Sequence, residues 1–429
     1  MLPNAAQAAI RFGLGARPDA MPPADPLPWL LAQVHTPSPA PGASLGEAVS
    51  AMREQKLDRA SRAPVEVFRA ECAAWASRMI QTREPFLERW ANFWTNHLTV
   101  SRRRRAMAPL IGNYQREAIR AHSFARYEDM LVAAYRHPAM LGYLDQNTST
   151  GPASRTGQRR SRGLNENLAR ECMELHTVTP AANYTQEDVT SLARVLTGWT
   201  TGRGEAAGEP DGFVFRSANH EPGTKRVLGR SFPEGEEGGL QALRFLARHP
   251  ATFRSLAFKL SRHFIADDPP VGPVRRIEAA LRDTGGDLGA AARAVIEAPE
   301  AWEPLRKVRD AQDYVIAAQR ALGSGPEDAS LTIASMIRLN QSLWGAPAPN
   351  GWADVAEEWA APEQLMRRLD LARRHSGRLA TARHANPAEV ADVFLGPFAR
   401  AETVAGVRGA GSMQEAFLLL LASPEAQRR

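Results

Sequence analysis

The chain has 429 residues, of which 44% are hydrophobic and 23% charged, and its net charge is +6. These ordinary globular values exclude a largely disordered chain and allow one large core or two domains. The only cysteines, Cys72 and Cys172, stand outside any CxxC spacing, which excludes a disulfide framework.

The first residues, MLPNAAQAAIRFGLGARP, contain no basic stretch followed by an apolar one, so no secretory signal is predicted. The longest apolar run, residues 417–422, is far shorter than the roughly 20 residues of a membrane span. We therefore expect no transmembrane segment and, by default, a cytoplasmic location. A periplasmic or envelope-associated location stays open.

Residues 1–60 are rich in proline and predict an N-terminal arm with one short helix near Trp29–Val34. Residues 61–429 are predicted to form the helical domain. Within it, Trp90, Phe93, Trp94 and His97 follow helical spacing and share one stripe. His97 is then either a core histidine bound to a carbonyl or a pocket histidine with useful proton chemistry near neutral pH.

Arginines cluster in two runs, Arg102–Arg105 and Arg155–Arg162. Such runs can hold phosphates, but no aromatic residues are interleaved as a platform for single strands would need. A solvated face is the simpler interpretation, so nucleic acid is not the expected partner.

The segment Asn165–Thr177, NENLARECMELHT, is predicted to be a helix with an apolar arc along Leu168, Cys172 and Leu175. The opposite face carries Asn167, Arg170, Glu171 and Glu174. The two glutamates are close enough to share a proton or bracket a cation, and a buried hydrogen-bond and ion-pair network is the alternative.

His176 falls across this predicted helix, near Asn165 and Cys172, and a structural role is expected for it. The segment lacks the Glu and His three residues apart of di-metal helix bundles, so no metal ligands are assigned.

A helix is predicted to start at Thr185, because Asp188 follows it as in a capping box, and to carry Arg194 on its polar face. Residues 200–235 are glycine-rich, and a short β-hairpin or an ordered loop is allowed near 212–230, around His220 and Lys225. Helical patterns then continue to the end. The class is therefore all-α, a large multi-helix single domain with at most that hairpin.

Lysine is rare in this chain: only Lys56, Lys225, Lys259 and Lys307 occur, and every other basic residue is arginine. This bias indicates codon usage rather than a nucleic-acid surface. Because an ammonium and a guanidinium are not equivalent at a tight site, the remaining lysines are expected to matter where they stand.

Several motifs occur in a fixed order, among them FWTNHLTV, HPAMLGYLDQNTS, NENLARECMELHTV, YTQEDVTSLARVLTGW, HEPGTKRVLG and NGWADVAEEW. By these motifs the chain resembles the domain of unknown function 1800 family of uncharacterised bacterial proteins. The resemblance implies a mostly helical domain and no established activity. Many relatives carry export signals, and their genes often neighbour those of exported, sulfatase-like domain of unknown function 1501 proteins, which implies a partner of that type.

The first functional hypothesis is an enzyme or a protein that binds a small anionic ligand through a polar site on the 165–177 and 185–198 helices. Its expected catalytic residues are Glu171, Glu174 and His97. Its expected ligand-binding residues are Asn165, Asn167, Arg170, Arg194, His220 and Lys225. The alternatives are a non-enzymatic helical scaffold and, third, nucleic-acid binding. The sequence names no cofactor.

Overall fold

The computed structural model describes all residues except 161–162, 203, 205–207 and 383–385. The chain is 63% helical, and the described residues form two small antiparallel sheets, which confirms the predicted all-α class. Two hairpins form where one was expected, because the glycine-rich segment also turns back on Trp199–Thr201 (β1). The pairs are β1 with β2 (Phe213–Phe215), and β3 (Lys225–Val227) with β4 (Arg230–Phe232).

The first sixty residues contain more helix than predicted, and much of that helix is buried. The elements are α1 (Pro3–Gln7), η1 (Ala8–Phe12, a π-helix), α2 (Pro26–Leu31) and α3 (Leu45–Leu57). Ala6, Phe12 and Leu30 have no exposed surface. Pro3 and Pro26 stand at the first helical position, where the missing N–H costs nothing. The division of the chain near residue 60 stays a prediction.

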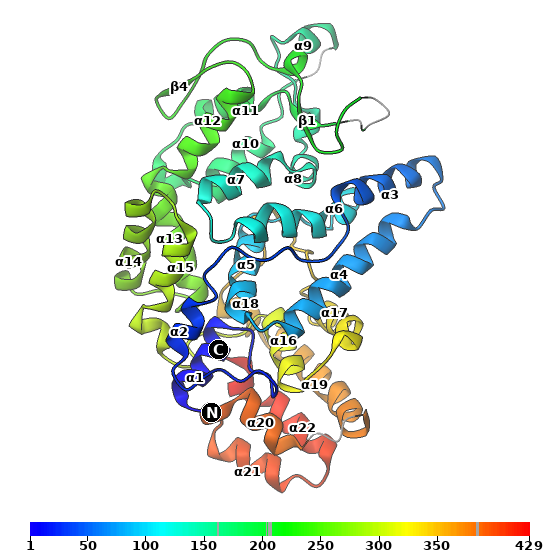
Figure 1. The fold of residues 1–429 in the computed structure, drawn as a ribbon, viewed down its shortest axis with the longest axis vertical. Coiled ribbons are helices and arrows are strands. Elements are labelled where there is room, and N and C mark those ends of the chain that lie inside the picture. Colours follow the sequence, from blue (N-terminus) through cyan, green and yellow to red (C-terminus); the bar gives the residue numbers. More distant parts are fainter. Residues whose placement is uncertain (161–162, 203, 205–207, 383–385) are drawn as a thin grey trace.

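Helix α5 lies near the centre of the molecule (Figure 1). Its aromatic stripe is buried, as the spacing predicted. Trp90 and Trp94 are fully buried and lie edge to face, with ring centroids 5.9 Å apart. The helices of this part are α4 (Ala63–Gln81), α5 (Pro85–His97), α6 (Ala108–Asn113), α7 (Tyr127–Arg136), α8 (Pro138–Tyr143) and α9 (Arg155–Arg160).

The predicted helix over residues 165–177 divides into α10 (Asn167–Glu171) and a π-helical turn, η6 (Cys172–His176). A π turn contains an extra residue, so side chains after Glu171 leave the positions that an ideal α-helical wheel assigns to them. The next helix, α11 (Gln186–Leu196), begins at the predicted capping box of Thr185 and Asp188.

In Figure 1 the remaining helices follow the left side (α12–α15), the centre (α16–α18) and the lower end of the molecule (α19–α22). They are α12 (Glu236–Ala247), α13 (Pro250–Phe264), α14 (Val271–Thr284), α15 (Leu288–Ile296), α16 (Ala311–Ala321), α17 (Ala329–Arg338), α18 (Ala356–Trp359), α19 (Pro362–Ala382), α20 (Pro387–Phe394), α21 (Ala401–Gly409) and α22 (Met413–Ala422). One large core joins most of the chain, and a smaller one joins α16 with α19–α22. Within the described ranges, no helix is long and apolar enough to cross a bilayer.

Candidate functional site

Polar side chains meet where α5 faces α13, in the middle of the aromatic core. Phe93 and His97 lie one turn apart on α5, and Lys259 and His263 lie one turn apart on α13. The rings of Phe93 and His263 are 5.3 Å apart between centroids, and Lys259 Nζ lies 3.5 Å from His97 Nδ1. The two helices thereby create two adjacent polar groups.

The first group is an interior cluster of His97, Tyr127, Tyr135, His176 and Lys259. Tyr127 donates its hydroxyl proton to the carbonyl oxygen of His176, so it must accept from His97 Nε2, 3.0 Å away. His97 therefore carries its proton on Nε2 and presents the Nδ1 lone pair to Lys259. The hydroxyl of Tyr135 lies 2.7 Å from His176 Nδ1.

Burial sets the charge of the interior cluster. It lowers the pKa of His97 well below its ordinary value and that of His176 to about 3. Burial, reinforced by Arg262, lowers the pKa of Lys259 to about 8. Lys259 is held by a 2.7 Å hydrogen bond to the carbonyl oxygen of Leu175. Near neutral pH the cluster therefore contains neutral imidazoles beside an easily deprotonated amine.

The second group lines a cavity of about 70 Å³ beside Phe93. Its polar lining comes from α5, α13, α16 and two loops: Arg89, Asn92, Asn96, His263, Asp310, Gln312, Asp313, Gln341 and Asp354. His263 Nδ1 lies 2.6 Å from Asp354 Oδ2. Among the described residues, His263 Nε2 has no hydrogen-bond partner.

Asp354 is surrounded by positive charge. Lys307 Nζ lies 3.2 Å from Asp354 Oδ1 and Arg429 Nη2 lies 3.6 Å from it. Burial alone would raise the pKa of Asp354, but His263, Lys307 and Arg429 outweigh it and hold that pKa well below the ordinary range. Burial lowers the pKa of His263 to about 4 against the opposing pull of Asp354. At neutral pH the pair is a carboxylate and a neutral imidazole.

Asp310 behaves differently from Asp354 although both line the cavity. Burial, with the nearby Asp313 carboxylate, raises the pKa of Asp310 to about 6. The Oδ1 atom of Asp310 caps the N-terminus of α16 by accepting a hydrogen bond from the Asp313 N–H at 2.7 Å. The cavity therefore combines a carboxyl that protonates readily with a carboxylate that stays ionised.

The glutamates of α10 and η6 belong to neither of these groups. Glu174 is exposed, and Glu171 is half-buried, with a pKa raised first by burial and then by Glu174. Within the described part of the chain, no hydrogen bond joins either glutamate to His97. His97 instead lies against His176, with ring centroids 5.8 Å apart.

Three of the other expected ligand-binding residues, Asn165, Asn167 and Arg170, form local hydrogen bonds. Arg170 pairs with Glu166 at 2.9 Å, and the Asn165 side chain accepts from the Asn167 N–H at 2.9 Å. Arg194 is partly exposed on α11. The structure thus places these four residues along α10 and α11, outside the interior cluster and the cavity.

His220 and Lys225 do come together, as their shared loop suggested. Lys225 Nζ lies 3.0 Å from His220 Nε2, which also accepts from the Gly235 N–H at 3.0 Å. His220 Nδ1 bonds the carbonyl oxygen of Thr197 at 2.7 Å. Burial lowers the pKa of both side chains. This pair fastens the glycine-rich segment to the end of α11.

The cavity residues His263 and Asp354 were missed as site residues by reasoning from the sequence. The rarity of lysine was the sequence feature that came closest to indicating them. Lys259 lies one turn before His263 on α13, and Lys307 contacts Asp354. Among the residues that the structure describes, no group of three or more His, Cys, Asp or Glu side chains is placed to hold a metal ion.

Comparison with known families gives one result that covers nearly the whole chain. A family model described as "Protein of unknown function (DUF1800)" matches residues 7–428. This match confirms the resemblance that the ordered motifs carry. No curated protein and no solved structure matches the chain.

Proposed function

We propose that this chain, which belongs to the DUF1800 family of proteins of unknown function by the match over residues 7–428, is an enzyme. His263 acts as a general base on a small polar substrate, or on a water molecule, in the cavity beside α5. Asp354 orients His263, and Asp310 supplies a proton or a hydrogen bond on the same cavity.

The observation that carries this proposal is the 2.6 Å contact between His263 Nδ1 and Asp354 Oδ2, with His263 Nε2 unpartnered among the described residues. An ionised Asp354 accepts a hydrogen bond from the Nδ1–H of His263, so the proton stays on Nδ1 and the lone pair is left on Nε2. That is the tautomer a general base needs. Lys307 and Arg429 keep Asp354 ionised while His263 changes charge.

The size and lining of the cavity favour a small polar group. About 70 Å³ admits several water molecules or the reacting end of a larger substrate. The amide side chains of Asn92, Gln312 and Gln341 line its walls. Asn92 also accepts from Trp75 Nε1 and Gln341 from the Gln312 N–H. Asp310, with a pKa of about 6, is protonated in a useful fraction of molecules near neutral pH.

The carboxylate face of α10 and η6 remains a second proposed site of the same general kind. There Glu171 and Glu174 would carry proton transfer, with Arg170 holding an anionic group. The half-buried position of Glu171 and its raised pKa support that role. His97 is not part of this second site, because it lies in the interior cluster beside Lys259 and Tyr127.

A non-enzymatic scaffold is the competing function, and closed ion pairs in the core favour it. Glu88 is buried and accepts from Arg120 at 2.7 Å and from Arg78 at 3.2 Å. Such closed networks fix how helices pack without doing chemistry. In this role the proposed partner is an exported sulfatase-like protein of the domain of unknown function 1501 type. Co-elution of the two purified proteins in gel filtration tests it.

A panel of small chromogenic substrates tests the enzymatic proposal: nitrophenyl acetate, nitrophenyl phosphate and nitrophenyl glycosides. We expect the wild-type protein to turn over one class and His263→Gln to reduce kcat by about 10²–10⁴-fold. His35→Gln is the matched control, because His35 also contacts a carboxylate but has a side chain 42% exposed. Equal rates for both variants would contradict the role of His263.

If no substrate of the panel is turned over, an NMR measurement shows whether His263 is wrongly assigned as the base or whether the panel lacks the right substrate. Long-range ¹H–¹⁵N spectra report which imidazole nitrogen carries the proton. We expect the Nδ1–H tautomer for His263 from neutral pH down to about pH 5, and its loss in Asp354→Asn. A His263 that is protonated on Nε2 at neutral pH would rule out the proposed base whatever the substrate.

A further inference from the structure

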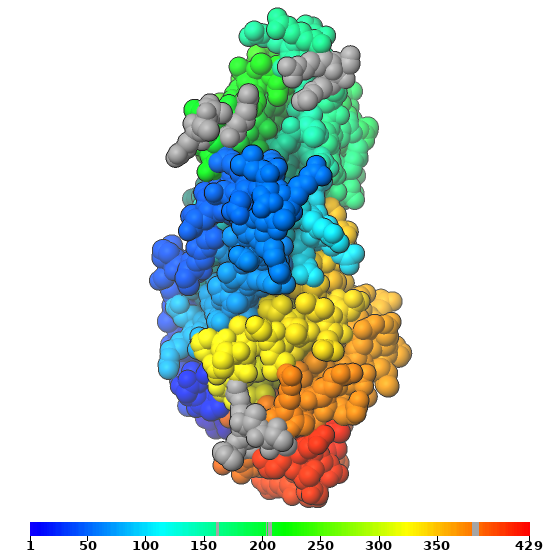
Figure 2. Space-filling view, turned by 90° about the vertical axis from the view of Figure 1, so that its right-hand side faces the viewer, coloured from blue at the N-terminus to red at the C-terminus, as the bar shows by residue number. Residues whose placement is uncertain are grey.

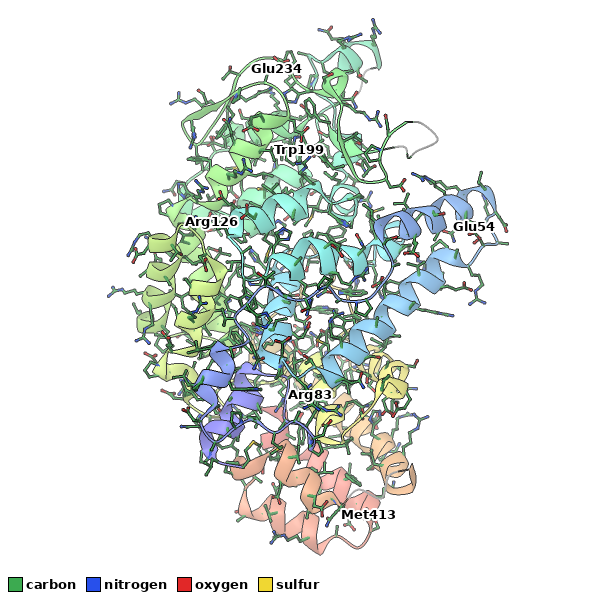
Figure 3. The ribbon with its side chains drawn as sticks, viewed as in Figure 1. Glu54, Arg83, Arg126, Trp199, Glu234 and Met413 are labelled. Carbon is green, nitrogen blue, oxygen red and sulfur yellow. The ribbon has the colours of Figure 1, made fainter. Side chains whose placement is uncertain are left out.

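A large cleft opens on the face where the α3–α4 hairpin meets the first arginine run. Its volume is about 1010 Å³, which is at the upper end for small-molecule sites. Figure 2 faces this side of the molecule, with the blue hairpin above the yellow α17. Figure 3 places Glu54 near the outer end of the hairpin, which projects from the body, and the next residue, Gln55, lines the cleft.

One side of the cleft is apolar. Pro64, Val65 and Phe68, from the first turns of α4, line it together with Ala106 and Pro109. Val65 is 40% exposed, so this apolar surface is open to solvent. An apolar body that bound here would remove that surface from water.

The other side of the cleft is cationic. Arg102, Arg103 and Arg105 line it, and no aspartate or glutamate does. Within the described residues none of these three arginines forms an ion pair, whereas their neighbour Arg104 pairs with Asp145. Asp145 therefore neutralises Arg104, the arginine of the run that does not line the cleft, and leaves the three lining arginines without a carboxylate partner among the described residues.

Two of the three arginines, Arg102 and Arg103, are held by contacts that leave guanidinium donors free. The Arg102 guanidinium lies over the Phe68 ring, 5.8 Å from its centre, a cation–π contact that uses none of its N–H donors. Arg103 Nε donates to the carbonyl oxygen of Gly345 at 3.2 Å. Arg105 is exposed. A guanidinium fork is suited to carboxylate and phosphate oxygens.

From this arrangement we infer that the cleft binds a small amphipathic anion, an acyl or aryl body with a single carboxylate or phosphate head. The head contacts Arg102 and Arg105, and the body covers Val65 and Phe68. Charge complementarity selects this class, because a neutral amphiphile would leave the arginines unused and a bare anion would leave the apolar wall exposed. The cleft shares no lining residue with the cavity of His263.

Binding of dansylaminoundecanoic acid, a fluorescent fatty-acid anion, tests the inference. We expect saturable fluorescence enhancement at low salt, and displacement by dodecyl phosphate below its micelle concentration. Dodecyl maltoside has the same tail and no charge, and inorganic phosphate has the charge and no tail. Each should displace the probe at least about tenfold less effectively. Equal displacement by either one would overturn the combined site.

Three variants locate the binding. Arg105→Ala and Val65→Asp alter exposed positions, so folding should be kept, and each should raise the Kd of the probe about tenfold. Arg155→Ala is the control, since Arg155 is exposed, belongs to the second arginine run and changes the net charge equally. An equal loss in the control would mean general charge attraction and would overturn the site.

Sedimentation with vesicles of phosphatidylglycerol separates a free amphiphile from a membrane surface. We expect the monomeric probe to bind without vesicles and with the same dependence on Arg105. Binding to vesicles alone, with no binding of the monomeric probe, would overturn the inference.

Discussion

Arg89 on α5 holds Asp313 on α16 by two parallel hydrogen bonds, Nη1 to Oδ2 at 2.9 Å and Nη2 to Oδ1 at 2.6 Å. The two residues are 224 positions apart in the chain and both are buried. Arg429 lies beside them, with Nε 3.0 Å from Asp313 Oδ2. This contact fixes α16 against the central helix and forms one wall of the cavity.

Removing one partner of this pair should be costly. We expect Arg89→Ala to lower the free energy of unfolding by about 3–5 kcal/mol, because a buried carboxylate loses its bidentate partner. The double variant Arg89→Met, Asp313→Leu should lose less than the single variant. Urea denaturation measures both. Arg367→Ala breaks an exposed pair with Glu363 and should leave stability nearly unchanged; a similar loss there would contradict the explanation.

His263 should make stability depend on pH below neutrality. Its pKa is about 4 in the folded protein against an ordinary 6.5, so between these values the unfolded chain binds the additional proton. Stability should therefore fall as the pH drops from 6.5 to 4. We expect His263→Gln to show a shallower fall, measured as the urea midpoint at each pH. Parallel curves for the two proteins would contradict the buried, neutral histidine.

Lys259 should make stability depend on pH above neutrality. Burial lowers its pKa to about 8 from an ordinary 10.5, so in this window the unfolded chain again binds more protons. The folded protein should gain stability relative to the unfolded chain as the pH rises from 8 to 10.5. In Lys259→Met this gain should be absent. Subtracting the two curves cancels the titration of tyrosines that the proteins share, and a flat difference would refute the shifted amine.

Gly112 on α6 lies directly against the buried Glu71 side chain of α4. A Cβ at Gly112 would overlap the Glu71 carboxylate, which Arg116 binds and which accepts from the Ala43 N–H at 2.6 Å. Gly112→Ala should therefore cost roughly 3 kcal/mol by displacing Glu71 from Arg116. Gly409→Ala is the control, because no atom lies within 4 Å of a Cβ there. Thermal unfolding should show a loss only in the first variant.

Local patterns allowed much of the fold to be predicted. The aromatic stripe of α5 is buried as its spacing required, and Thr185 with Asp188 begins α11. Both features depend on residues within a few positions of one another, so a sequence displays them directly. The extra residue of η6 escaped prediction, because a π turn has no strong local signature. The contact of His176 with His97 also escaped prediction, because it joins η6 to the distant helix α5.

The sequence by itself determined the helical class, the family and the unusual standing of Lys225, Lys259 and Lys307. The tertiary structure decided which of these side chains meet. His263 and Asp354 are 91 residues apart, and Arg89 and Asp313 are 224 apart, so no periodicity connects them. Their contacts arise because packing of distant helices buries charges, and a buried charge is stable only where another element brings its partner.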